Sequence, residues 1–491
     1  MPEPLIFEKS RPGRIGAMLP RLDVPEQPIE RLIPKEALRR TPPDLPEMAE
    51  IDVVRHFTRL SKLNVGIDDV FYPLGSCTMK YNPRLNEGGI RDAGLAALHP
   101  YQPEETVQGM LEILWNVERW LSNLSGLPHV SLHPCAGAQG ELAALLCMRA
   151  WFEDQGERRT RVLIPDSAHG TNPASCTLAG FKPVQVRSGP RGTVDLELLA
   201  KSLGPDVACL MVTNPNTLGL FEEDIAKIAS MAHEAGAFLY MDGANFNALV
   251  GVARPGDFGV DAMHFNLHKT FTQPHGGGGP GAGPIGVVDR LEPYLPVPRT
   301  LQENGRYRLD YGRPKSIGQL RAYATSGGVM GRTWFYMRSV GREGMRRIAE
   351  NAVLNANYLR ALLKGVYHLP YDRTCMHEVL FTAKLQKQKG DVSAVDIGKR
   401  LLDYGYHPPT VAFPLVVHDA LLIEPTETES RETLEGFAEA MKAIAREAEE
   451  DPAKIKGAPW TKPVRRLDDV RAARQPVLRW KRDGGGAAPA R

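Results

Sequence analysis

The stretch Phe238-Leu-Tyr-Met-Asp242, followed by His264-Phe-Asn-Leu-His-Lys-Thr-Phe271, decides the fold class of this chain. An apolar run that stops at an aspartate is typical of a buried parallel strand with a carboxylate at its carboxyl end. Ligands of open α/β sheets bind at such strand ends, and Lys269 on the following loop can reach the same place. The two segments therefore predict an α/β domain with a ligand site around Asp242 and Lys269.

A second segment has the composition of an anion site. The residues from Ala136 to Gly140 are small except for Gln139. They lead directly into a segment of strong helix-forming residues that continues to Met148. A helix N-terminus offers free backbone N–H groups and a partial positive charge, which suit a phosphate dianion. Small residues such as Gly137 and Ala138 let the backbone approach that phosphate closely.

Two more apolar runs end in polar residues that suit a bound aromatic ring. Val162–Pro165 precedes His169, whose imidazole can stack on a pyridine ring. The run that begins at Cys209 precedes Asn214, which can reach a ring hydroxyl. Both segments add strand-end loops to the same predicted edge of the sheet.

Together these residue types match the needs of pyridoxal 5′-phosphate (PLP). Its aldehyde needs an amine for a Schiff base, which Lys269 supplies, and its pyridinium nitrogen needs an acidic partner, which Asp242 supplies. Each feature alone has a plainer interpretation: a surface lysine, a helix-capping aspartate, a structural histidine or an ordinary loop before a helix. Four strand-end loops with matching chemistry favour a PLP enzyme over those separate interpretations.

Composition sets the broad class of the protein. The chain has 491 residues, of which 42% are hydrophobic, and its net charge of +2 argues against nucleic acid as a main partner. No apolar run approaches the roughly 18 residues that a membrane span needs, and the N-terminus lacks a signal-peptide core. The six cysteines form no C-x-x-C pair and are interpreted as reduced thiols. These features predict a cytoplasmic enzyme without a membrane partner.

Four parts are expected along the chain. Residues 1–50 contain ten prolines and form an extended N-terminal arm, and residues 51–330 form the large PLP-binding domain. Residues 331–450 form a small α+β domain, with helices expected near 341–364, 395–402 and 431–450 and strands near 378–383 and 420–424. Residues 451–491 form a basic tail.

Two other motifs do not support an alternative site. Gly281-Ala-Gly-Pro-Ile-Gly286 matches a dinucleotide-binding pattern, but no strand leads directly into it and a proline lies inside it. His264 and His268 have the spacing of a zinc pair, but Phe265 stands where a metalloprotease has its glutamate. We therefore expect no metal site.

Several stretches carry a specific family resemblance, and they cover the chain from about residue 50 to 430. They are Phe71–Pro83, His133–Glu141, Asp166–Ser175, Val212–Phe221, Met241–Asn245, Asn266–Thr270 and Ile423–Thr428. In these stretches the chain resembles the P-protein family of the glycine cleavage system, in the form that is split into two subunits, and it resembles the second of them.

The resemblance implies a fold and a set of site residues. The fold is that of a fold type I PLP-dependent enzyme, similar to aspartate aminotransferase, with a large mixed-sheet domain and a smaller C-terminal α+β domain. By resemblance, Lys269 is the Schiff-base lysine and Asp242 the partner of the pyridinium nitrogen. His169 and Ala244 cover the two ring faces. The phosphate is lined by Gly137, Ala138 and Gln139, together with His268.

The resemblance also implies an activity and partners. The expected reaction is PLP-dependent decarboxylation of glycine, with transfer of the aminomethyl group to the lipoyl arm of the H-protein. The expected assembly is a heterotetramer with two copies each of this chain and a homologous first subunit. Candidates for binding the glycine carboxylate are Arg373, His377 and the Thr426–Thr428 turn.

Two alternatives remain at this stage. One is another fold type I enzyme, such as an aminotransferase or a different decarboxylase. The other is a non-catalytic scaffolding half, against which the presence of Lys269, Asp242 and His169 argues.

Overall fold

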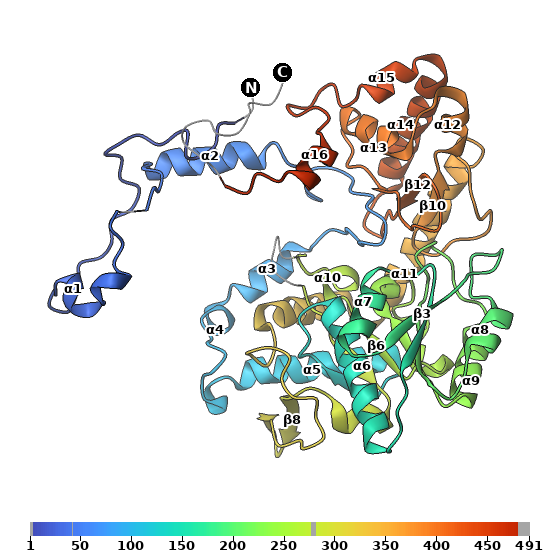
Figure 1. The fold of residues 1–491 in the computed structure, drawn as a ribbon, viewed down its shortest axis with the longest axis horizontal. Helices are drawn as coiled ribbons and strands as arrows, with labels where there is room; N and C mark the ends of the chain where they lie inside the picture. Colours follow the sequence, from blue (N-terminus) through green and yellow to red (C-terminus); the bar gives the residue numbers. More distant parts are fainter. Residues whose placement is uncertain (1–2, 42, 276–280, 480–491) are drawn as a thin grey trace. The chain divides into compact units, whose positions relative to one another are not determined.

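A computed structural model describes residues 3–41, 43–275 and 281–479 of the chain (Figure 1). It divides into two compact units. One unit runs from Val70 to Lys456, and the other combines the segment up to Asp69 with the segment from Gly457. This division is coarser than the four parts expected from the sequence, whose finer boundaries stay predictions.

A seven-stranded mixed sheet forms the centre of the larger unit. Its order is β1-β7-β6-β5-β4-β2-β3. Strand β7 runs antiparallel to both of its neighbours, β1 and β6, and the other neighbouring strands are parallel. The strands are β1 (His129–Ser131), β2 (Arg161–Pro165), β3 (Lys182–Val186), β4 (Val207–Thr213), β5 (Phe238–Asp242), β6 (Ala262–His264) and β7 (Ile285–Val287).

The two faces of this sheet bury alternate residues of each strand. In β5, Leu239 and Met241 belong to one hydrophobic core and Phe238 and Tyr240 to another. This alternation follows from the two-residue period of a strand whose two faces are both covered.

Helices supply the cover on both faces. The first core includes residues of α5 (Gln108–Ser125), α9 (Ile225–Glu234) and α11 (Gly327–Leu363). The second core includes residues of α6 (Gly137–Asp154) and α7 (Thr171–Leu178). The carboxyl ends of β4 and β5, which carry Thr213 and Asp242, therefore lie at an edge of the sheet between the two layers of helices.

The shorter elements of this region connect the larger ones. They are α3 (Arg84–Ile90), α4 (Ala93–Ala96), η2 (Glu104–Thr106), α8 (Leu196–Ser202), η3 (Gly243–Ala248), η4 (Pro255–Phe258), α10 (Leu267–Thr270), η5 (Asp289–Tyr294) and the hairpin of β8 (Arg299–Glu303) and β9 (Arg306–Asp310).

Helix α11 is longer than the sequence pattern indicates. The sequence predicts a helix from about residue 341, whereas the observed helix begins at Gly327. Gly341 has φ of 67°, a left-handed conformation that interrupts the helix at this point. The sequence pattern therefore predicts the part of α11 that follows Gly341. The break at this glycine explains why the part from Gly327 is not predicted.

A three-stranded antiparallel sheet contributes to a further hydrophobic core of the larger unit. Its order is β10-β12-β11, with β10 (Val379–Thr382), β12 (Ala420–Ile423) and β11 (Thr410–Val411). The helices of this region are α12 (Lys384–Gly390), α13 (Ala394–Asp403), α14 (Arg431–Glu450) and α15 (Pro452–Lys456). The predicted combination of a large mixed sheet with a smaller C-terminal α+β region is confirmed.

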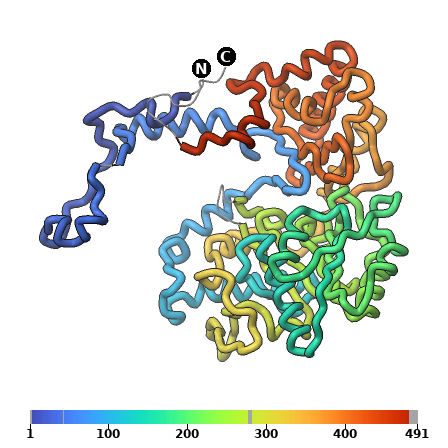
Figure 2. The backbone as a smooth tube through the Cα atoms, viewed as in Figure 1, coloured from blue at the N-terminus to red at the C-terminus, as the bar shows by residue number. Residues whose placement is uncertain are grey.

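The smaller unit has little regular structure. It contains α1 (Ile29–Leu32), η1 (Lys35–Ala37), α2 (Glu50–Ser61) and α16 (Asp469–Arg474). Figure 2 traces the segment before α2 as a mostly extended tube. Many of its large apolar side chains are exposed, among them Met18 at 86% and Leu19 at 93%.

Two further expectations concern the compartment of the protein. Within the described ranges, no helix combines the length and the apolar character that a membrane crossing requires. All six cysteines are free, and four of them are buried. The cytoplasmic location itself stays a prediction.

Candidate active site

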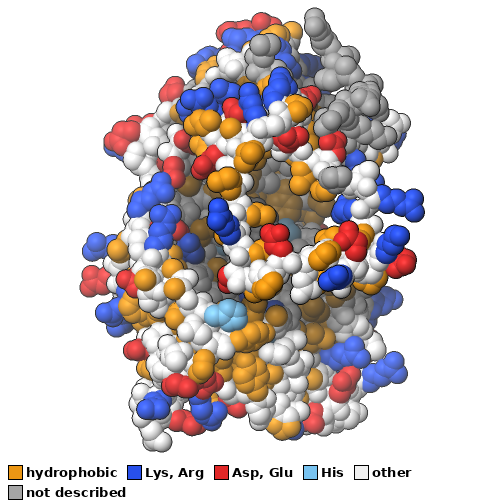
Figure 3. Space-filling view, turned by 90° about the vertical axis from the view of Figure 1, so that its left-hand side faces the viewer, with side chains coloured by type: hydrophobic (Ala, Val, Ile, Leu, Met, Phe, Trp, Pro, Cys, Tyr) orange, Lys and Arg blue, Asp and Glu red, His pale blue; other side chains and the backbone are white. Residues whose placement is uncertain are grey.

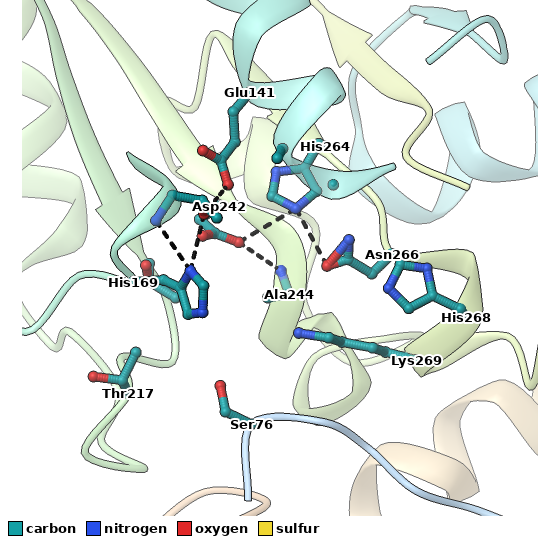
Figure 4. A pocket seen from close by; sticks show the side chains of 14 residues that line it. Ser76, Glu141, His169, Thr217, Asp242, Ala244, His264, Asn266, His268 and Lys269 are labelled. Carbon is teal, nitrogen blue, oxygen red and sulfur yellow. Dashed lines mark hydrogen bonds and ion pairs between the residues drawn. The ribbon is translucent and has the colours of Figure 1, made fainter. Parts of the chain in front are cut away.

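One pocket collects most of the predicted site residues at the carboxyl ends of the central strands (Figure 4). Seven of the nine predicted residues line it: Gly137, Ala138, His169, Asp242, Ala244, His268 and Lys269. The other lining residues are Ser76, Glu141, Thr171, Thr213, Thr217, His264 and Asn266. Strand β5 contributes Asp242 as its last residue, and α10 contributes Lys269. Lys269 therefore lies in a short helix, whereas the sequence predicts a loop.

Asp242 is a buried carboxylate with a full set of partners. Its Oδ1 accepts a hydrogen bond from the Ala244 amide at 2.9 Å, and its Oδ2 accepts one from Nδ2 of Asn172 at 3.1 Å. Burial alone would raise the pKa of Asp242, but the neighbouring His264 ring, the amide donor and Lys269 outweigh it and hold the pKa below its ordinary value. Asp242 is therefore ionised at neutral pH.

His264 connects Asp242 to a buried tyrosine. Its Nε2 lies 3.4 Å from Oδ1 of Asp242, and its Nδ1 lies 2.6 Å from the Tyr240 hydroxyl. Burial is the main reason that the pKa of Tyr240 lies well above its ordinary value, and nearby carboxylates raise it further. The hydroxyl therefore keeps its proton. The hydroxyl can then donate to Nδ1, which leaves the Nε2–H of the ring directed at Asp242.

Glu141 is a second buried carboxylate next to Asp242. Its two oxygens accept hydrogen bonds from the hydroxyls of Thr171 and Ser175, each at 2.8 Å. Burial and the charge of Asp242 raise the pKa of Glu141. The pKa values of the two carboxyl groups are thus shifted in opposite directions, and Asp242 is the stronger acid of the two.

His169 lies over the pocket from the loop after β2. The Thr171 amide donates to Nδ1 of His169 at 3.2 Å, and the Thr171 hydroxyl lies 2.9 Å from the same atom. The amide contact makes Nδ1 an acceptor, so the proton of the neutral ring is on Nε2. This contact fixes the ring orientation, while the ring itself is exposed.

Lys269 extends its ammonium group into the middle of the pocket (Figure 4). Among the described residues it forms no hydrogen bond or ion pair, so it is available to a ligand. The adjacent His268 is held in its neutral form, because burial and the charge of Lys269 lower its pKa to about 3. His268 can therefore donate a hydrogen bond to a phosphate but cannot supply a positive charge to it.

The N-terminus of α6 forms another wall of the pocket. No side chain caps this helix end at Ala136. A Cβ atom on Gly137 would collide with the Asn266 amide, and one on Gly283 would collide with the Ala136 carbonyl. Glycine at these positions therefore allows the close backbone packing that exposes the N–H groups of the first helical turn to the pocket.

Two predicted site residues do not line the pocket. The Gln139 side chain accepts from the Cys135 amide and donates to the Leu320 carbonyl, so it is occupied by backbone groups. Asn214 is fully buried, and its Oδ1 accepts from the Glu222 amide at 3.1 Å. Thr213 lines the pocket in its place, because successive residues at a strand end point to opposite sides.

The candidates for carboxylate binding lie elsewhere. Arg373 pairs with Glu223, and His377 is fully buried, as is Thr426, whose hydroxyl lies 2.9 Å from that of Thr428. None of these residues lines the pocket.

Comparison with known proteins shows the family of this chain. The glycine cleavage system P-protein family model matches residues 22–305, and the model of the glycine dehydrogenase C-terminal domain matches residues 348–459. A probable glycine dehydrogenase (decarboxylating) subunit 2 of Caldanaerobacter subterraneus subsp. tengcongensis is 54% identical over 477 residues, which cover 97% of this chain and 98% of that protein. The chain belongs to the glycine cleavage system P-protein family. A protein of the same description from Halalkalibacterium halodurans is 54% identical over 479 residues, which cover 97% of this chain and 98% of that one.

Solved structures agree at the level of the fold. A glycine decarboxylase (P-protein) of the glycine cleavage system, in inhibitor-bound form, superposes with a TM-score of 0.70 at 23% identity over 85% of this chain and 94% of that chain. A glutamate decarboxylase of Lactobacillus brevis superposes with a TM-score of 0.62 at 14% identity over 88% of this chain and 96% of that chain. The predicted fold type I architecture is confirmed.

Sequence reasoning missed seven of the lining residues, and two of them, Glu141 and His264, carried a signal. Glu141 lies one helical turn after Gly137 and so shares its face of α6. His264 is the last residue of β6, where the strand-end rule applies as it does for Asp242. Ser76 had no such signal, because it reaches the pocket from a segment outside the central sheet.

Proposed function

We propose that this chain is the catalytic subunit of a PLP-dependent glycine decarboxylase. Lys269 holds the cofactor, and the aminomethyl group left after CO₂ release passes to the lipoyl arm of the H-protein. The observation that carries the proposal is the meeting of Lys269, Asp242 and the N-terminus of α6 in one pocket. Membership of the P-protein family supports glycine as the substrate, and the subunit 2 name of the relatives supports a first subunit as a partner.

The residues present fit PLP at each of its polar groups. The Lys269 amine is accessible for covalent attachment to the aldehyde. The ionised Asp242 can hold a proton on the pyridine nitrogen, since a buried carboxylate favours a cationic partner. The uncapped first turn of α6 and the neutral His268 offer hydrogen-bond donors to the phosphate.

When bound, PLP supplies an electron sink for the pair left by the departing CO₂. The protein's part is to keep that sink effective. Asp242 keeps the proton on the pyridine nitrogen, and Asn172 and the Ala244 amide hold the carboxylate in place. His169, oriented by Thr171, lines one side of the pocket, where its imidazole can stack on the cofactor ring.

The charge of the pocket favours a decarboxylase over an aminotransferase. Among the described residues that line it there is no arginine. A buried arginine would pair with a substrate carboxylate and stabilise the charge that must disappear as CO₂ leaves. If neutral donors hold the substrate carboxylate instead, they bind it without opposing the loss of its charge as CO₂ leaves.

The smaller unit supports assembly with a partner subunit. Large apolar side chains are exposed along its N-terminal segment, including Ile15 at 70% and Leu22 at 64%. Figure 3 shows hydrophobic side chains exposed between charged ones on one face of the molecule. Such exposure is typical of surfaces that a partner covers. We therefore place the first subunit of the enzyme on this segment, in a complex with two copies of each chain.

A visible-absorbance spectrum tests this function. The chain is purified with its first subunit and PLP, and spectra are recorded with and without glycine. We expect a band of lysine-bound cofactor that shifts when glycine is added. Alanine and glutamate serve as competing amino acids. A larger shift with either of them than with glycine would favour another fold type I activity and contradict the proposal.

A further inference from the structure

Ser76 enters the pocket from outside the central sheet. Its side chain lines the pocket together with Lys269, on the wall formed by the segment before α3 (Figure 4). The Ser76 hydroxyl has no hydrogen-bond partner among the described residues. A hydroxyl in this position is free to contact a ligand.

The backbone at Ser76 is in a conformation that serine rarely adopts. Its φ is 63°, and Thr78, two residues later, has φ of 49°. The left-handed region costs a residue with a Cβ atom about 1 kcal/mol, whereas glycine adopts it freely. A serine at a position suited to glycine indicates that its hydroxyl is used, since strained residues concentrate at functional sites.

Two buried carboxylates hold this strained turn from behind. Oε2 of Glu378 accepts the Ser76 N–H at 2.7 Å. Glu424 accepts both the N–H and the hydroxyl of Thr78, at 2.9 and 2.6 Å. Both glutamates are fully buried, so their hydrogen bonds to the turn are not exchanged for water.

The turn is also packed against β12. A Cβ atom on Gly75 would lie 2.6 Å from the Leu422 carbonyl oxygen, and the Thr410 hydroxyl donates to the Gly75 carbonyl at 2.8 Å. Ser76 is thus fixed by contacts with the small sheet, and its hydroxyl has a defined place in the pocket.

The charges around the pocket determine which end of a substrate can lie near Ser76. Asp242, whose negative charge repels an anion, lies together with Glu141 beside His264. Ser76 and Lys269 present a hydroxyl and an ammonium group without such neighbours in the pocket lining. Glu378 and Glu424 lie behind the same turn, but each accepts a hydrogen bond from the turn, and burial raises the pKa of Glu378. The Ser76 hydroxyl is therefore the donor on this wall of the pocket that a substrate carboxylate can reach.

We propose that Ser76 donates a hydrogen bond to the carboxylate of glycine and that Glu378 is the positioning residue that holds Ser76 through its backbone N–H. This inference rests on the proposed function and names the carboxylate subsite of the same pocket. The donor is neutral, so it orients the carboxylate without adding an ion pair that would resist loss of its charge.

Two substitutions of Ser76 separate the contribution of its hydroxyl to glycine binding from that of its backbone conformation. Ser76→Ala removes the hydroxyl and keeps the Cβ atom, and Ser76→Gly removes the hydroxyl and relaxes the backbone. Binding of glycine and of methylamine, which lacks the carboxylate, is titrated by absorbance on the PLP-loaded complex. A lost hydrogen bond to a charged group corresponds to about 10-fold weaker glycine binding or more. We expect that loss in both variants, with methylamine binding and PLP affinity within about 2-fold of the unsubstituted complex.

Substitutions of Glu378 test the positioning role. Glu378→Gln keeps an oxygen that can accept the Ser76 N–H, whereas Glu378→Leu removes it. We expect Glu378→Leu to weaken glycine binding by about 10-fold with little effect on methylamine, and Glu378→Gln to restore most of the affinity. A purely structural role would weaken both ligands together.

The outcomes distinguish this inference from the proposed function. If the unsubstituted complex gives no response to glycine, or binds it no better than methylamine, the carboxylate subsite is absent and the inference fails with the function. If glycine binds the unsubstituted complex but Ser76→Gly binds it equally well, the function stands and the role of Ser76 is refuted. A parallel loss of PLP affinity would assign Ser76 to the cofactor phosphate instead and would also overturn the inference.

Discussion

The charge of Asp242 is the property of a single residue on which the proposed chemistry depends most. Asp242→Asn keeps the shape and removes the charge, so a pyridine nitrogen beside it would no longer be held protonated. A lost buried charge pair of about 3 kcal/mol corresponds to a rate reduced by at least about 100-fold. We expect PLP to remain bound while glycine-dependent ¹⁴CO₂ exchange falls by that factor.

A surface aspartate provides the matched control. The Asp289 side chain is 89% exposed beside His129, and Asp289→Asn should leave the exchange rate within about 2-fold of that of the unsubstituted chain. Activity of Asp242→Asn in the same range would remove Asp242 from the mechanism.

At the residue scale, the sequence predicts the site residues that lie at the end of a strand. It does not predict those that reach the pocket from segments outside the central sheet. Asp242 is the last residue of an uninterrupted apolar strand, and its place in the pocket follows from that pattern. The sequence predicts Asn214 as a site residue, whereas the last residue of β4, Thr213, is the one that lines the pocket. Ser76 depends on contacts with Glu378, some 300 residues away in the chain, and no local pattern encodes such a contact.

At the scale of elements, the N-terminus of α6 should act as the phosphate site. Gly137→Ala adds a Cβ atom that would collide with the Asn266 side chain, so either that side chain or the first turn of α6 must shift, and both line the pocket. We expect at least about 10-fold weaker PLP binding, equivalent to about 1.4 kcal/mol. Equilibrium dialysis measures it. Gly109→Ala on α5 is the control, because a Cβ there has no neighbour within 4 Å and should leave PLP affinity unchanged.

The packing of α13 against α14 includes a bidentate ion pair. Nε and Nη2 of Arg400 donate to the two oxygens of Glu447 at 2.8 and 2.9 Å. Burial would raise the pKa of Glu447, but hydrogen bonds from Arg400 and Lys454 lower it from 4.5 to about 2. A depressed carboxyl pKa stabilises the folded state above pH 4.5, and this contribution is lost as the pH falls through about 2.

Glu447→Gln should therefore destabilise the chain by about 2–3 kcal/mol at pH 7, and the difference should shrink steadily between about pH 5 and pH 2. Chemical denaturation at several pH values measures it. The exposed pair of Arg346 and Glu350 is the control, and Glu350→Gln should cost less than about 1 kcal/mol. A pH-independent difference for Glu447→Gln would show that packing, not charge, carries the effect.

The sequence located half of the ten strands of the two sheets, because apolar runs and turn residues mark them. Strands β2, β4, β5, β10 and β12 and helices α13 and α14 lie within a few residues of their predicted positions. The edge strand β11 has two residues, too few to give a periodic pattern. The joining of the N-terminal and C-terminal segments in one unit is a long-range contact that composition does not encode.

At the scale of the whole molecule, the exposed apolar residues of the N-terminal segment should bind the first subunit. Met18 and Leu19 are 86% and 93% exposed, so replacing both with aspartate should not disturb the folded chain. We expect at least about 10-fold weaker association with the first subunit, measured by analytical ultracentrifugation, with an unchanged melting temperature. Leu354→Asp on α11, where the leucine is 64% exposed, is the control and should leave association unaltered. Full association of the double variant would exclude this segment from the interface.

The exchange of label between glycine carboxyl carbon and CO₂ tests the central claim most directly. The complex of both subunits is loaded with PLP and supplied with lipoylated H-protein, and Lys269→Ala is compared with Lys389→Ala, a lysine of α12 that pairs with Glu449. Because the alanine cannot attach the cofactor, we predict rapid exchange in the unsubstituted and Lys389→Ala complexes and at least about 100-fold slower exchange in Lys269→Ala. Absence of exchange in the unsubstituted complex, or persistence of exchange in Lys269→Ala, would contradict the account.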